Sequence, residues 1–482
     1  MREKTSSKFA EYQQARIAHW DTVAKQRRGW HGWGGRYHRR LEQLYRLTIP
    51  SGKRVLEVGC GNGDLLAAVQ PQHGVGVDFS PEMVTYAQEQ HSELTFKQLD
   101  AHQVGNLNEQ FDFIILSDLV NDLYDVQQVM EGLRKLSHPG TRIVINVYSR
   151  IWQLPLLIAE GLRLATPNLN QNWLTIPDLR GLLELSGFQV VATGHEILFP
   201  LPIPLINDLC DRFLAHIFPF SLFALTNMLI ARPEPMPAPA TEKLPTVSVV
   251  VPARNEEGNV PAIFARIPEM GGGTEIIFVE GNSHDQTYEA IEQEIPKHPD
   301  QKAFLYKQPG KGKADAVRVG FEKATGDILM ILDADLTVPP EDLPRFYQAI
   351  ASGKGEFING VRLVYPMEEE AMRFLNFLGN KFFSLAFSWL LNQNIKDTLC
   401  GTKVLWKRDY QIITENRAYF GDFDPFGDFD LLFGAAKMRL KILDLPIRYR
   451  ERTYGSTNIS RWSHGMLLLK MVLFAAIKLK FV

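Results

Sequence analysis

Two aspartates, Asp333 and Asp335, come directly after the apolar run Ile328–Leu332. A run of this kind predicts a buried strand, and two carboxylates that leave such a strand together can converge on one hard cation. Magnesium or manganese held in this way would bridge to diphosphate oxygens and neutralise a departing nucleotide. Because turns are rich in aspartate, the pair by itself is weak evidence for this chemistry.

The surroundings of the two aspartates strengthen the prediction of a metal site. Upstream, Val249–Glu256 has the pattern of a strand that runs into a polar loop. The lysines of Gly310–Lys313 can contribute positive charge near a phosphate group. Together these features predict a nucleotide-sugar site in which Asp333 and Asp335 bind Mg²⁺ or Mn²⁺.

A second chemical pattern lies at Val55–Gly63, where an apolar strand runs into a glycine loop. Gly59, Gly61 and Gly63 let the backbone turn tightly and approach a ligand closely. Their spacing is Gly-x-Gly-x-Gly, which differs from the Gly-x-Gly-x-x-Gly pattern favoured by dinucleotides. The loop is therefore a candidate site for a nucleoside that is not a dinucleotide.

Acidic residues at the ends of neighbouring predicted strands also point to a nucleoside. Asp78 ends the next strand, where a carboxylate can accept both ribose hydroxyls, and Asp100 ends the third strand, where it could face an adenine ring. A glycine turn alone is common in α/β loops. The presence of Glu57, Asp78 and Asp100 at three strand ends favours ligand binding over a purely structural turn.

Residues that could handle an acceptor follow the fourth predicted strand. Asp118, Asn121 and Asp122 are candidates for a base or an acceptor clamp. Residues that could complete a lid over the same site are His31, His38 and Asn172–Trp173. A hydrogen-bonded loop aspartate or a surface histidine is the commoner role for such residues.

Strand and helix patterns alternate between Arg54 and Tyr148, and again between Val247 and Leu332. This alternation predicts parallel sheets covered by helices on both faces. At 482 residues the chain has room for two such domains. Prolines recur between Arg232 and Pro245, which predicts an extended spacer between the domains.

The expected fold class is therefore α/β with two domains. We expect the first domain at residues 1–232, including a helical and basic extension at 1–50, the linker at 233–245, the second domain at 246–465 and an amphipathic helix at 466–482.

The composition excludes several classes of protein. A net charge of −3 gives no reason to expect a nucleic-acid partner, and three cysteines far apart match no disulfide framework or zinc spacing. A reducing cytosol fits best. The polar N-terminus speaks against a secretory signal, and no window of about 18 uncharged apolar residues predicts a spanning helix.

The terminal segment 466–482 leaves two interpretations open. Lys470 and Lys478 are eight residues apart and would share one helix face, with apolar residues largely elsewhere. Such a helix could lie on an anionic membrane surface. Alternatively, it packs its apolar face on its own domain.

The first half of the chain resembles the class I S-adenosylmethionine-dependent methyltransferases over about residues 50–150. The matching stretches are Glu57–Gly63, Gly76–Ser80, Asp100–His102 and Phe111–Asp118. The resemblance implies a Rossmann-like sheet in which Gly59, Gly61 and Gly63 line the cofactor, Asp78 holds its ribose and Asp100 lies near its adenine. Family acceptor residues usually lie at the position of Asp118, but the sequence does not choose among sugar, lipid and small-molecule acceptors.

About residues 245–465 resemble the family 2 glycosyltransferases of the GT-A fold, and most nearly the dolichol-phosphate mannose synthase-like enzymes. The matching stretches are Val250–Glu257, Gly310–Ala314, Ala324–Asp335, Asp397–Leu405 and Arg452–Gly455. The resemblance implies that Pro252, Arg254, Asn255 and Glu256 border the nucleotide, that Lys313 contributes positive charge, and that Asp333 and Asp335 hold metal and donor. It also implies inversion of the anomeric centre.

The second predicted strand of this half departs from the family pattern. The family usually has two adjacent acidic residues there, whereas this chain has Glu280 followed by Gly281. Glu280 can still contact the base, and Asp285 remains in register with a family aspartate. The identity of the donor is therefore not carried over.

Two kinds of acceptor remain open for the second domain. A polyprenyl phosphate is already anionic and needs positive clamps, for which Arg362, Arg373 and Arg452 are candidates. A glycan hydroxyl would instead need a general base, and Asp428 and Asp430 lie where hydroxyl-using relatives keep theirs.

We therefore predict a cytoplasmic bifunctional transferase, peripheral on the inner membrane face, that acts on a lipid-linked or cell-surface glycan intermediate. One alternative is a soluble hydroxyl acceptor for the second domain. Another is a first domain that binds S-adenosylmethionine without transferring methyl groups and regulates the second. A third is a non-catalytic membrane scaffold, which the Asp333 and Asp335 pair disfavours.

Overall fold

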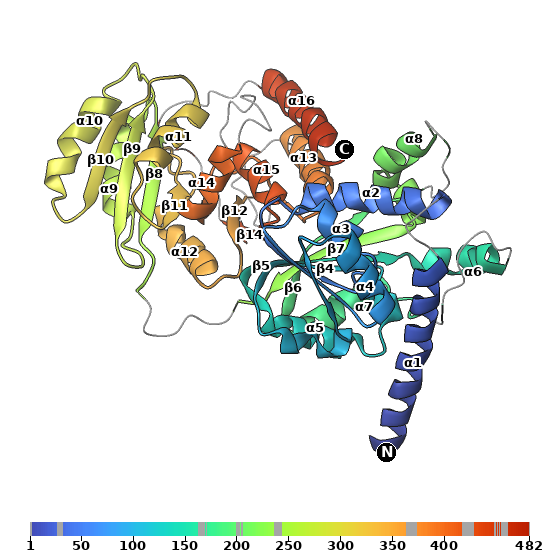
Figure 1. Cartoon of the computed structure of the whole chain (residues 1–482). Helices are drawn as coiled ribbons and strands as arrows, with labels where there is room; N and C mark the ends of the chain where they lie inside the picture. Colours follow the sequence, from blue (N-terminus) through green and yellow to red (C-terminus); the bar gives the residue numbers. More distant parts are fainter. Residues whose placement is uncertain are drawn as a thin grey trace. The chain divides into compact units, whose positions relative to one another are not determined.

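A computed structural model of the chain describes residues 2–26, 32–161, 169, 171–198, 203, 206–235, 243–362, 374–416, 429–447, 450, 452, 454 and 461–481. Contacts divide the chain into two compact units, Met1–Glu234 and Pro235–Val482, drawn from blue to green and from yellow-green to red in Figure 1. The division falls within the expected linker 233–245, of which residues 236–242 lie outside the described ones.

A seven-stranded sheet forms the middle of the first unit. Its strand order is β3-β2-β1-β4-β5-β7-β6, in which β7 runs antiparallel to both neighbours and the other described pairings are parallel. The strands are β1 (Arg54–Val58), β2 (His73–Asp78), β3 (Thr95–Gln98), β4 (Phe111–Ser117), β5 (Ser137–Tyr148), β6 (Phe188–His195) and β7 (Thr226–Pro233). The last two strands, β6 and β7, complete the sheet.

Helices cover both faces of this sheet (Figure 1). Leu41 of α2 and Leu66 of α3 join the core on one face, whereas Met130 of α5 and Leu183 of α7 join the core on the other. The helices are α1 (Arg2–Gln26), α2 (Gly32–Thr48), α3 (Asp64–Ala68), α4 (Pro81–Gln90), α5 (Val126–Lys135), α6 (Gln153–Gly161), α7 (Ile176–Leu185) and α8 (Ile206–Arg212). Short 3₁₀ turns are η1 (Ala101–Leu107), η2 (Val120–Asp122), η3 (Arg150–Trp152), η4 (Leu214–His216) and η5 (Phe220–Phe223).

The second unit is built on another seven-stranded sheet, in the order β10-β9-β8-β11-β13-β12-β14. Strand β13 runs antiparallel to β11 and β12, while the other described pairings are parallel. The strands are β8 (Val247–Ala253), β9 (Thr274–Glu280), β10 (Lys302–Lys307), β11 (Ile328–Ile331), β12 (Phe357–Val361), β13 (Lys403–Trp406) and β14 (Ile442–Pro446). Every residue of β11 is fully buried, because helices cover both faces of the sheet.

Two hydrophobic cores lie on the two faces of the second sheet. Phe264 of α9 and Phe346 of α12 belong to one core, and Phe321 of α11, Phe387 of α13 and Phe433 of α15 belong to the other. The helices are α9 (Val260–Arg266), α10 (Thr287–Glu294), α11 (Lys313–Lys323), α12 (Leu343–Ala351), α13 (Phe374–Leu391), α14 (Lys407–Glu415), α15 (Phe429–Lys437) and α16 (Arg461–Leu479), with 3₁₀ turns η6 (Glu257–Asn259), η7 (Ile295–Lys297) and η8 (Pro340–Asp342).

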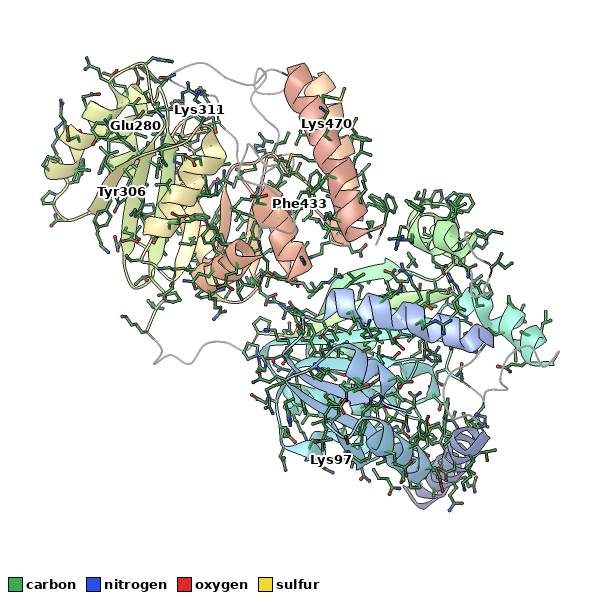
Figure 2. All side chains as sticks on the ribbon, turned by 45° about the horizontal axis from the view of Figure 1, so that its top comes forward. Lys97, Glu280, Tyr306, Lys311, Phe433 and Lys470 are labelled. Carbon is green, nitrogen blue, oxygen red and sulfur yellow. The ribbon has the colours of Figure 1, made fainter. Side chains whose placement is uncertain are left out.

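The terminal helix α16 is apolar on two faces. It begins at Arg461, five residues before the expected boundary at residue 466. Met471 and Ala475 are buried in a core shared with α13, whereas Leu473 and Ile477 are exposed on the other side. Lys470 also projects from α16 (Figure 2). None of the helices in the described part of the chain combines the length and apolarity needed to cross a bilayer.

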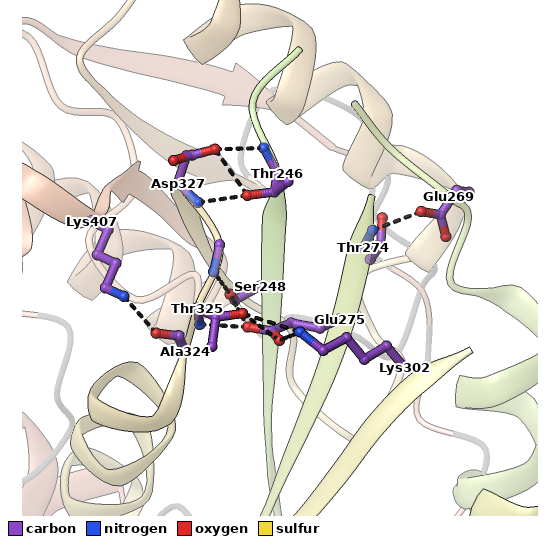
Figure 3. Close-up of polar contacts among 11 residues, drawn as sticks. Thr246, Ser248, Glu269, Thr274, Glu275, Lys302, Ala324, Thr325, Asp327 and Lys407 are labelled. Atoms are coloured by element: carbon purple, nitrogen blue, oxygen red, sulfur yellow. Dashed lines mark hydrogen bonds and ion pairs between the residues drawn. The ribbon is translucent and has the colours of Figure 1, made fainter. Parts of the chain in front are cut away.

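Glu275 of β9 joins the amino-terminal ends of the central strands of the second unit (Figure 3). Its carboxylate accepts hydrogen bonds from Ser248 Oγ at 2.7 Å and from Thr325 N and Oγ1 at 2.6 and 2.8 Å, and it pairs with Lys302 Nζ at 2.8 Å. Burial favours the neutral carboxyl, but these donors outweigh it and hold the pKa of Glu275 at about 2. The ionised carboxylate is therefore a stabilising group of this fold.

We expect Glu275→Gln to lower the free energy of unfolding of the second unit by about 2 kcal/mol at neutral pH, because a buried network loses its charged acceptor. The folded pKa lies below the ordinary value of 4.5, so the stabilisation is complete above pH 4.5 and declines as the pH falls towards 2. Hydrogen exchange of amides in β8, β9 and β11 measures this difference. The exposed Glu292→Gln serves as the control, and equal protection in the two variants would contradict the prediction.

Candidate active sites

The glycine loop of the first unit joins β1 to α3 at the carboxyl edge of the sheet. Gly59, Gly61 and Gly63 have φ angles of 72°, 50° and 79°, in the left-handed region that favours glycine. A Cβ at Gly63 would collide with the ring of Phe96, whereas a Cβ at Gly61 would meet nothing within 4 Å. Open space therefore adjoins the backbone of Gly61, as expected where a ligand approaches.

Asp78, at the end of β2, faces this loop. Its Oδ2 accepts a hydrogen bond from Gly61 N at 3.0 Å, and its Oδ1 accepts one from Ser80 N at 2.9 Å. Each carboxylate oxygen can accept a second hydrogen bond, so both can still receive a hydroxyl. Burial raises the pKa of Asp78 to about 6, although the backbone donors oppose the rise.

Asp100 follows β3 and holds the imidazole of His102. Asp125 N donates to His102 Nε2 at 3.1 Å, so the ring proton is on Nδ1, which donates to Asp100 Oδ1 at 2.6 Å. Gln13 of α1 donates to Asp100 Oδ2. Burial favours the neutral acid, but the hydrogen bonds from His102 and Gln13 outweigh it and hold the pKa of Asp100 below its usual value.

Helix α1 covers a pocket at this edge of the sheet. The pocket is lined by Tyr12, Gln13, Arg16, Phe79, Asp100, Ala101, His102, Leu119, Asp122 and Leu123. The sequence predicted a helical segment at 1–50 but placed the lid at His31, which lies outside the described residues, at His38 and at Asn172–Trp173. It did not predict that this helix covers the pocket. The available signal was the spacing of Phe9, Tyr12, Arg16 and Trp20, which places their side chains on one helix face.

Asp118 follows β4 with a φ of 51°, an unusual backbone for a residue other than glycine. Tyr37 Oη donates to its Oδ1 at 3.0 Å, and Asn146 Nδ2 donates to the same oxygen at 2.7 Å. Asn146 is oriented in turn by Tyr45, whose hydroxyl donates to Asn146 Oδ1 at 2.7 Å. Burial raises the pKa of Asp118 to about 7, despite the two hydrogen bonds. A carboxyl group can act as a general base when hydrogen bonds orient it through one oxygen and its pKa is near neutrality.

The other acceptor candidates of the first unit have different surroundings. Arg16 Nε contacts Asp122 Oδ1 at 2.9 Å, so that carboxylate is engaged with α1. His38 lies in α2, and burial lowers its pKa to about 4, which keeps the ring neutral. Asn172 N donates to Asn121 O at 2.6 Å, which joins the predicted lid residue to the turn after β4.

Among the buried side chains of the first unit that have polar atoms without a hydrogen-bond partner, two belong to residues named as site candidates from the sequence. They are Glu57, through Oε2, and Asn121, through both amide atoms. Native structures rarely keep such atoms unpaired, because they lose their hydration without compensation. Burial also raises the pKa of Glu57 well above its usual value. With Asp78 and Asp100, this set of donors and acceptors fits a polar nucleoside cofactor.

The Asp-x-Asp pair of the second unit leaves β11 beside two cations. Lys313 Nζ, at the start of α11, lies 2.7 Å from Asp333 Oδ1, and Arg452 Nη2 lies 2.6 Å from Asp335 Oδ2. Arg452 Nη1 also reaches Glu256 Oε1 at 3.4 Å. Burial, reinforced by the negative charges of nearby acids, raises the pKa of Glu256 to about 7 despite Arg452. The structure thus brings together five predicted site residues from different stretches of the chain, namely Asp333, Asp335, Lys313, Arg452 and Glu256.

Gly401 packs directly on the pair of Asp333 and Lys313. A Cβ at this position would lie 2.0 Å from Asp333 Oδ2 and 2.3 Å from Lys313 Nζ. No side chain larger than hydrogen fits without displacing the pair. Sequence reasoning did not assign this role to Gly401, although the residue lies in the matching stretch Asp397–Leu405.

The donor set at Asp333 and Asp335 fits a hard divalent cation. Carboxylate oxygens are the ligands that Mg²⁺ prefers, and Mg²⁺ sites often use one or two carboxylates together with substrate phosphates and water. Among the described residues, no group of three His, Cys, Asp or Glu side chains is arranged to hold a metal ion. The two carboxylates therefore fit a cation that arrives with a phosphate ligand.

The loops after β8 and β9 contain the residues that are predicted to border the nucleotide. Pro252 lies within β8 and Arg254 follows it, while Asn255 adopts a φ of 57°. Asn255 N donates to Ser283 Oγ at 3.0 Å, and His284 N donates to Asn255 Oδ1 at 2.7 Å.

These hydrogen bonds join the two loops at the carboxyl edge of the sheet. Glu280 ends β9 there and accepts a hydrogen bond from Ser283 N at 2.5 Å (Figure 2). Asp285 accepts one from Thr287 N at 3.1 Å. Glu280 and Asp285 thus border the same loop as Asn255.

The remaining predicted residues of the second unit have separate surroundings. Arg362 forms a two-pronged ion pair with the buried Asp397, with Nε–Oδ2 at 2.7 Å and Nη2–Oδ1 at 2.9 Å. Much of its guanidinium is thereby engaged within the fold. Asp430 lies in the first turn of α15. Arg373 and Asp428 lie outside the described residues.

Comparisons with known proteins match a family model to part of each half of the chain. Residues 27–193 match a family model described as a methyltransferase domain, and residues 248–410 match glycosyl transferase family 2. Solved structures similar to the first half include magnesium protoporphyrin IX methyltransferase from Synechocystis (19% identical, 45% of this chain and 84% of that one, TM-score 0.27). Another is an S-adenosylmethionine-dependent methyltransferase from Mesorhizobium loti (17% identical, 39% and 96%, TM-score 0.31).

Curated relatives match about a fifth of the chain. A dolichol-phosphate mannosyltransferase from Pyrococcus furiosus is 38% identical over 109 residues, which cover 22% of this chain and 30% of the relative. An undecaprenyl-phosphate 4-deoxy-4-formamido-L-arabinose transferase from Aeromonas hydrophila is 34% identical over 111 residues, covering 22% and 34%. The chain spans about a third of the length of these relatives. The two family models therefore assign a methyltransferase domain to residues 27–193, followed by a family 2 glycosyltransferase domain at residues 248–410.

Proposed function

We propose that the second unit transfers a sugar from a nucleotide diphosphate to a polyprenyl phosphate, with inversion at the anomeric carbon. The observation that carries this proposal is the convergence of Asp333, Asp335, Lys313 and Arg452 at the carboxyl edge of the sheet. A divalent cation bound to the two carboxylates would supply positive charge for the donor diphosphate. The names of the two relatives, which act on dolichol phosphate and undecaprenyl phosphate, support this class of acceptor.

The cations of the site suit an anionic acceptor. A phosphate oxygen is nucleophilic without proton removal, so the protein must reduce charge repulsion and orient the two substrates. Arg452 and Lys313 can hold phosphate oxygens once a cation and donor occupy the carboxylates, since both side chains already lie at the site. Arg373 and Arg362 remain candidates for the same clamp. Asp428 and Asp430 would serve as bases only with a hydroxyl acceptor.

We propose that the first unit transfers a methyl group from S-adenosylmethionine to a glycan intermediate of the same pathway. Gly61 and Asp78 would hold the ribose side of the cofactor, and Asp100 and Gln13 would lie by the adenine. Asp118 would accept a proton from the acceptor hydroxyl through Oδ2, because its hydrogen bonds from Tyr37 and Asn146 both go to Oδ1. This arrangement favours a catalytic domain over one that only binds the cofactor.

The proposed place of the enzyme in the cell follows from its proposed substrates. A polyprenyl phosphate lies in a bilayer, while nucleotide sugars and S-adenosylmethionine are cytosolic. We therefore propose a peripheral position on the cytoplasmic face of the membrane, supported by the exposed apolar side chains of α16 beside Lys470.

Incubation with Mn²⁺, polyprenyl phosphate and a panel of UDP-, GDP- and dTDP-sugars tests the glycosyltransferase proposal. We expect one donor to release nucleotide diphosphate only when the lipid is present. Chelation of the cation should abolish the release. Release without the lipid, or no release with any donor, would reject the polyprenyl phosphate acceptor and direct the search to glycan hydroxyls.

The pH dependence of cofactor affinity tests the role of Asp78. The ionised carboxylate accepts ribose hydroxyls better than the neutral acid, so affinity for S-adenosylmethionine should fall as the pH drops through about 6. In Asp78→Asn we expect about tenfold weaker binding and no such pH dependence. Isothermal titration between pH 5 and 8 measures both effects. An unchanged pH profile in Asp78→Asn would exclude Asp78 as the titrating group.

A further inference from the structure

The first unit exposes a band of large apolar side chains on Ile206–Phe223, the segment that comprises α8, η4 and η5. Its members include Leu209, Ile217, Phe218, Phe220, Leu222 and Phe223. Phe218 has 76% of its surface exposed, which is far from a core environment. Monomeric soluble proteins rarely leave contiguous apolar side chains of this size in water without a binding function.

Helix α6 extends this band. Trp152 Nε1, just before α6, donates to Phe223 O at 2.8 Å, which places the start of the helix beside η5. Trp152 and Leu156 pack against the core, whereas Leu154 and Ile158 are exposed, Leu154 by 71%. A helix that is apolar on both its inner and its outer face is expected in a core or in contact with lipid.

Arginines lie at the edge of the apolar band. Arg36 of α2 pairs with Asp211 of α8 at 2.8 Å, and both residues lie within electrostatic range of Arg40, as do Arg212 and Glu196. Among these five residues, three guanidinium groups outnumber two carboxylates, which leaves one positive charge in excess. Burial lowers the pKa of Arg40, and its buried Nε has no hydrogen-bond partner. The edge of the band is therefore suited to an anion.

The exposed charge on Ile206–Phe223 itself is also positive. Arg212 is exposed and is the only exposed charged side chain among those described in Ile206–Phe223, where the side chain of Asp208 is not described. Surfaces that lie in the interface of an anionic bilayer typically combine phenylalanine and leucine with arginine. A protein partner would more often be met by a polar rim of mixed charge.

We propose that α6 and Ile206–Phe223, together with the adjacent arginines, dock the first unit on an anionic lipid bilayer. The apolar side chains enter the boundary between headgroups and acyl chains, and the arginines bind lipid phosphates. This docking surface is distinct from α16 of the second unit. It also requires no assumption about the sugar or about the methyl acceptor.

Sedimentation of the full chain with vesicles tests the proposal. The vesicles contain either phosphatidylglycerol and phosphatidylcholine or phosphatidylcholine alone. We expect binding to the anionic vesicles to fall at least about tenfold in Leu154→Gln/Leu157→Gln/Ile158→Gln, because three exposed apolar side chains are removed from the interface. Leu222→Gln on the neighbouring segment should weaken binding in the same direction, and both variants should keep the wild-type melting temperature.

Three further variants test which surface and which charge account for the binding to vesicles. Leu185→Gln alters a leucine of α7 that is 72% exposed, close to the 71% of Leu154, and should leave binding unchanged. Arg212→Gln should weaken binding to the anionic vesicles by about fivefold and leave binding to phosphatidylcholine unchanged. Leu473→Gln/Ile477→Gln alters α16 and measures the separate contribution of the second unit.

Equal binding of the wild type and the α6 triple variant to anionic vesicles would overturn the proposal, as would the absence of wild-type binding. A dimer detected by sedimentation velocity and lost in the triple variant, without vesicle binding, would instead assign the band to an interface between two copies of the chain.

Discussion

Asp335→Asn should reduce sugar transfer by about 1,000-fold, since it removes a charge that the site uses to hold a cation and the donor diphosphate. Asp335 Oδ1 is oriented by Thr337, whose hydroxyl donates to it at 2.8 Å, and Oδ2 faces Arg452. Asparagine keeps the size of the side chain and can still accept from Thr337. The fold should therefore persist while the electrostatic function is lost.

Two measurements separate loss of function from loss of structure. Nucleotide diphosphate release gives the rate, and isothermal titration of Mn²⁺ in the presence of nucleotide diphosphate gives the affinity for the cation. Asp342→Asn is the matched control, because Asp342 follows the same strand but forms an exposed pair with Arg345 at 3.2 Å. A rate within tenfold of the wild type in Asp335→Asn would reject Asp335 as a ligand of the donor complex.

Asp118→Asn should lower methyl transfer by about 100- to 10,000-fold while affinity for S-adenosylmethionine changes little, because the amide cannot accept a proton. The base must be ionised to act, and the pKa of Asp118 is about 7. The rate in the wild type should therefore rise as the pH increases through about 7. Radiolabelled S-adenosylmethionine with the glycolipid product of the second unit as acceptor measures the transfer.

Tyr37→Phe provides a more specific test of the same carboxyl group. The Tyr37 hydrogen bond stabilises the ionised form, so its removal should raise the pKa of Asp118 and shift the pH profile to higher pH. Carbon-13 spectroscopy of labelled aspartate carboxyls measures this pKa without any acceptor. Asp112→Asn, at the opposite end of β4, is the control. An unchanged pKa in Tyr37→Phe would contradict the hydrogen-bond argument.

Much of each candidate site could be predicted because its residues are close in sequence to a recognisable strand. Gly61 and Asp78 follow β1 and end β2, and Asp333 and Asp335 follow β11. In a parallel sheet the carboxyl ends of neighbouring strands lie on one edge, so the order of elements along the chain already groups such residues. The two α/β domains and their helices follow from the same alternation of patterns.

Other contacts depend on residues that are distant in sequence. Arg452 lies 117 positions from Asp335, and Gln13 lies 87 positions from Asp100. No local periodicity reports which arginine reaches which carboxylate. For the same reason the sequence did not predict that Arg362, a candidate phosphate clamp, pairs with Asp397.

The amino-acid sequence by itself determined the two-domain α/β architecture, the glycine loop and the acidic strand ends, because local spacing governs backbone pattern and the polar ends of parallel strands. Only the tertiary structure decided that α1 covers the first site, that Tyr37 and Asn146 hold one oxygen of Asp118, and that Gly401 leaves room for Asp333 and Lys313. These features depend on burial and on long-range packing, which set the pKa of a carboxyl and the space around it.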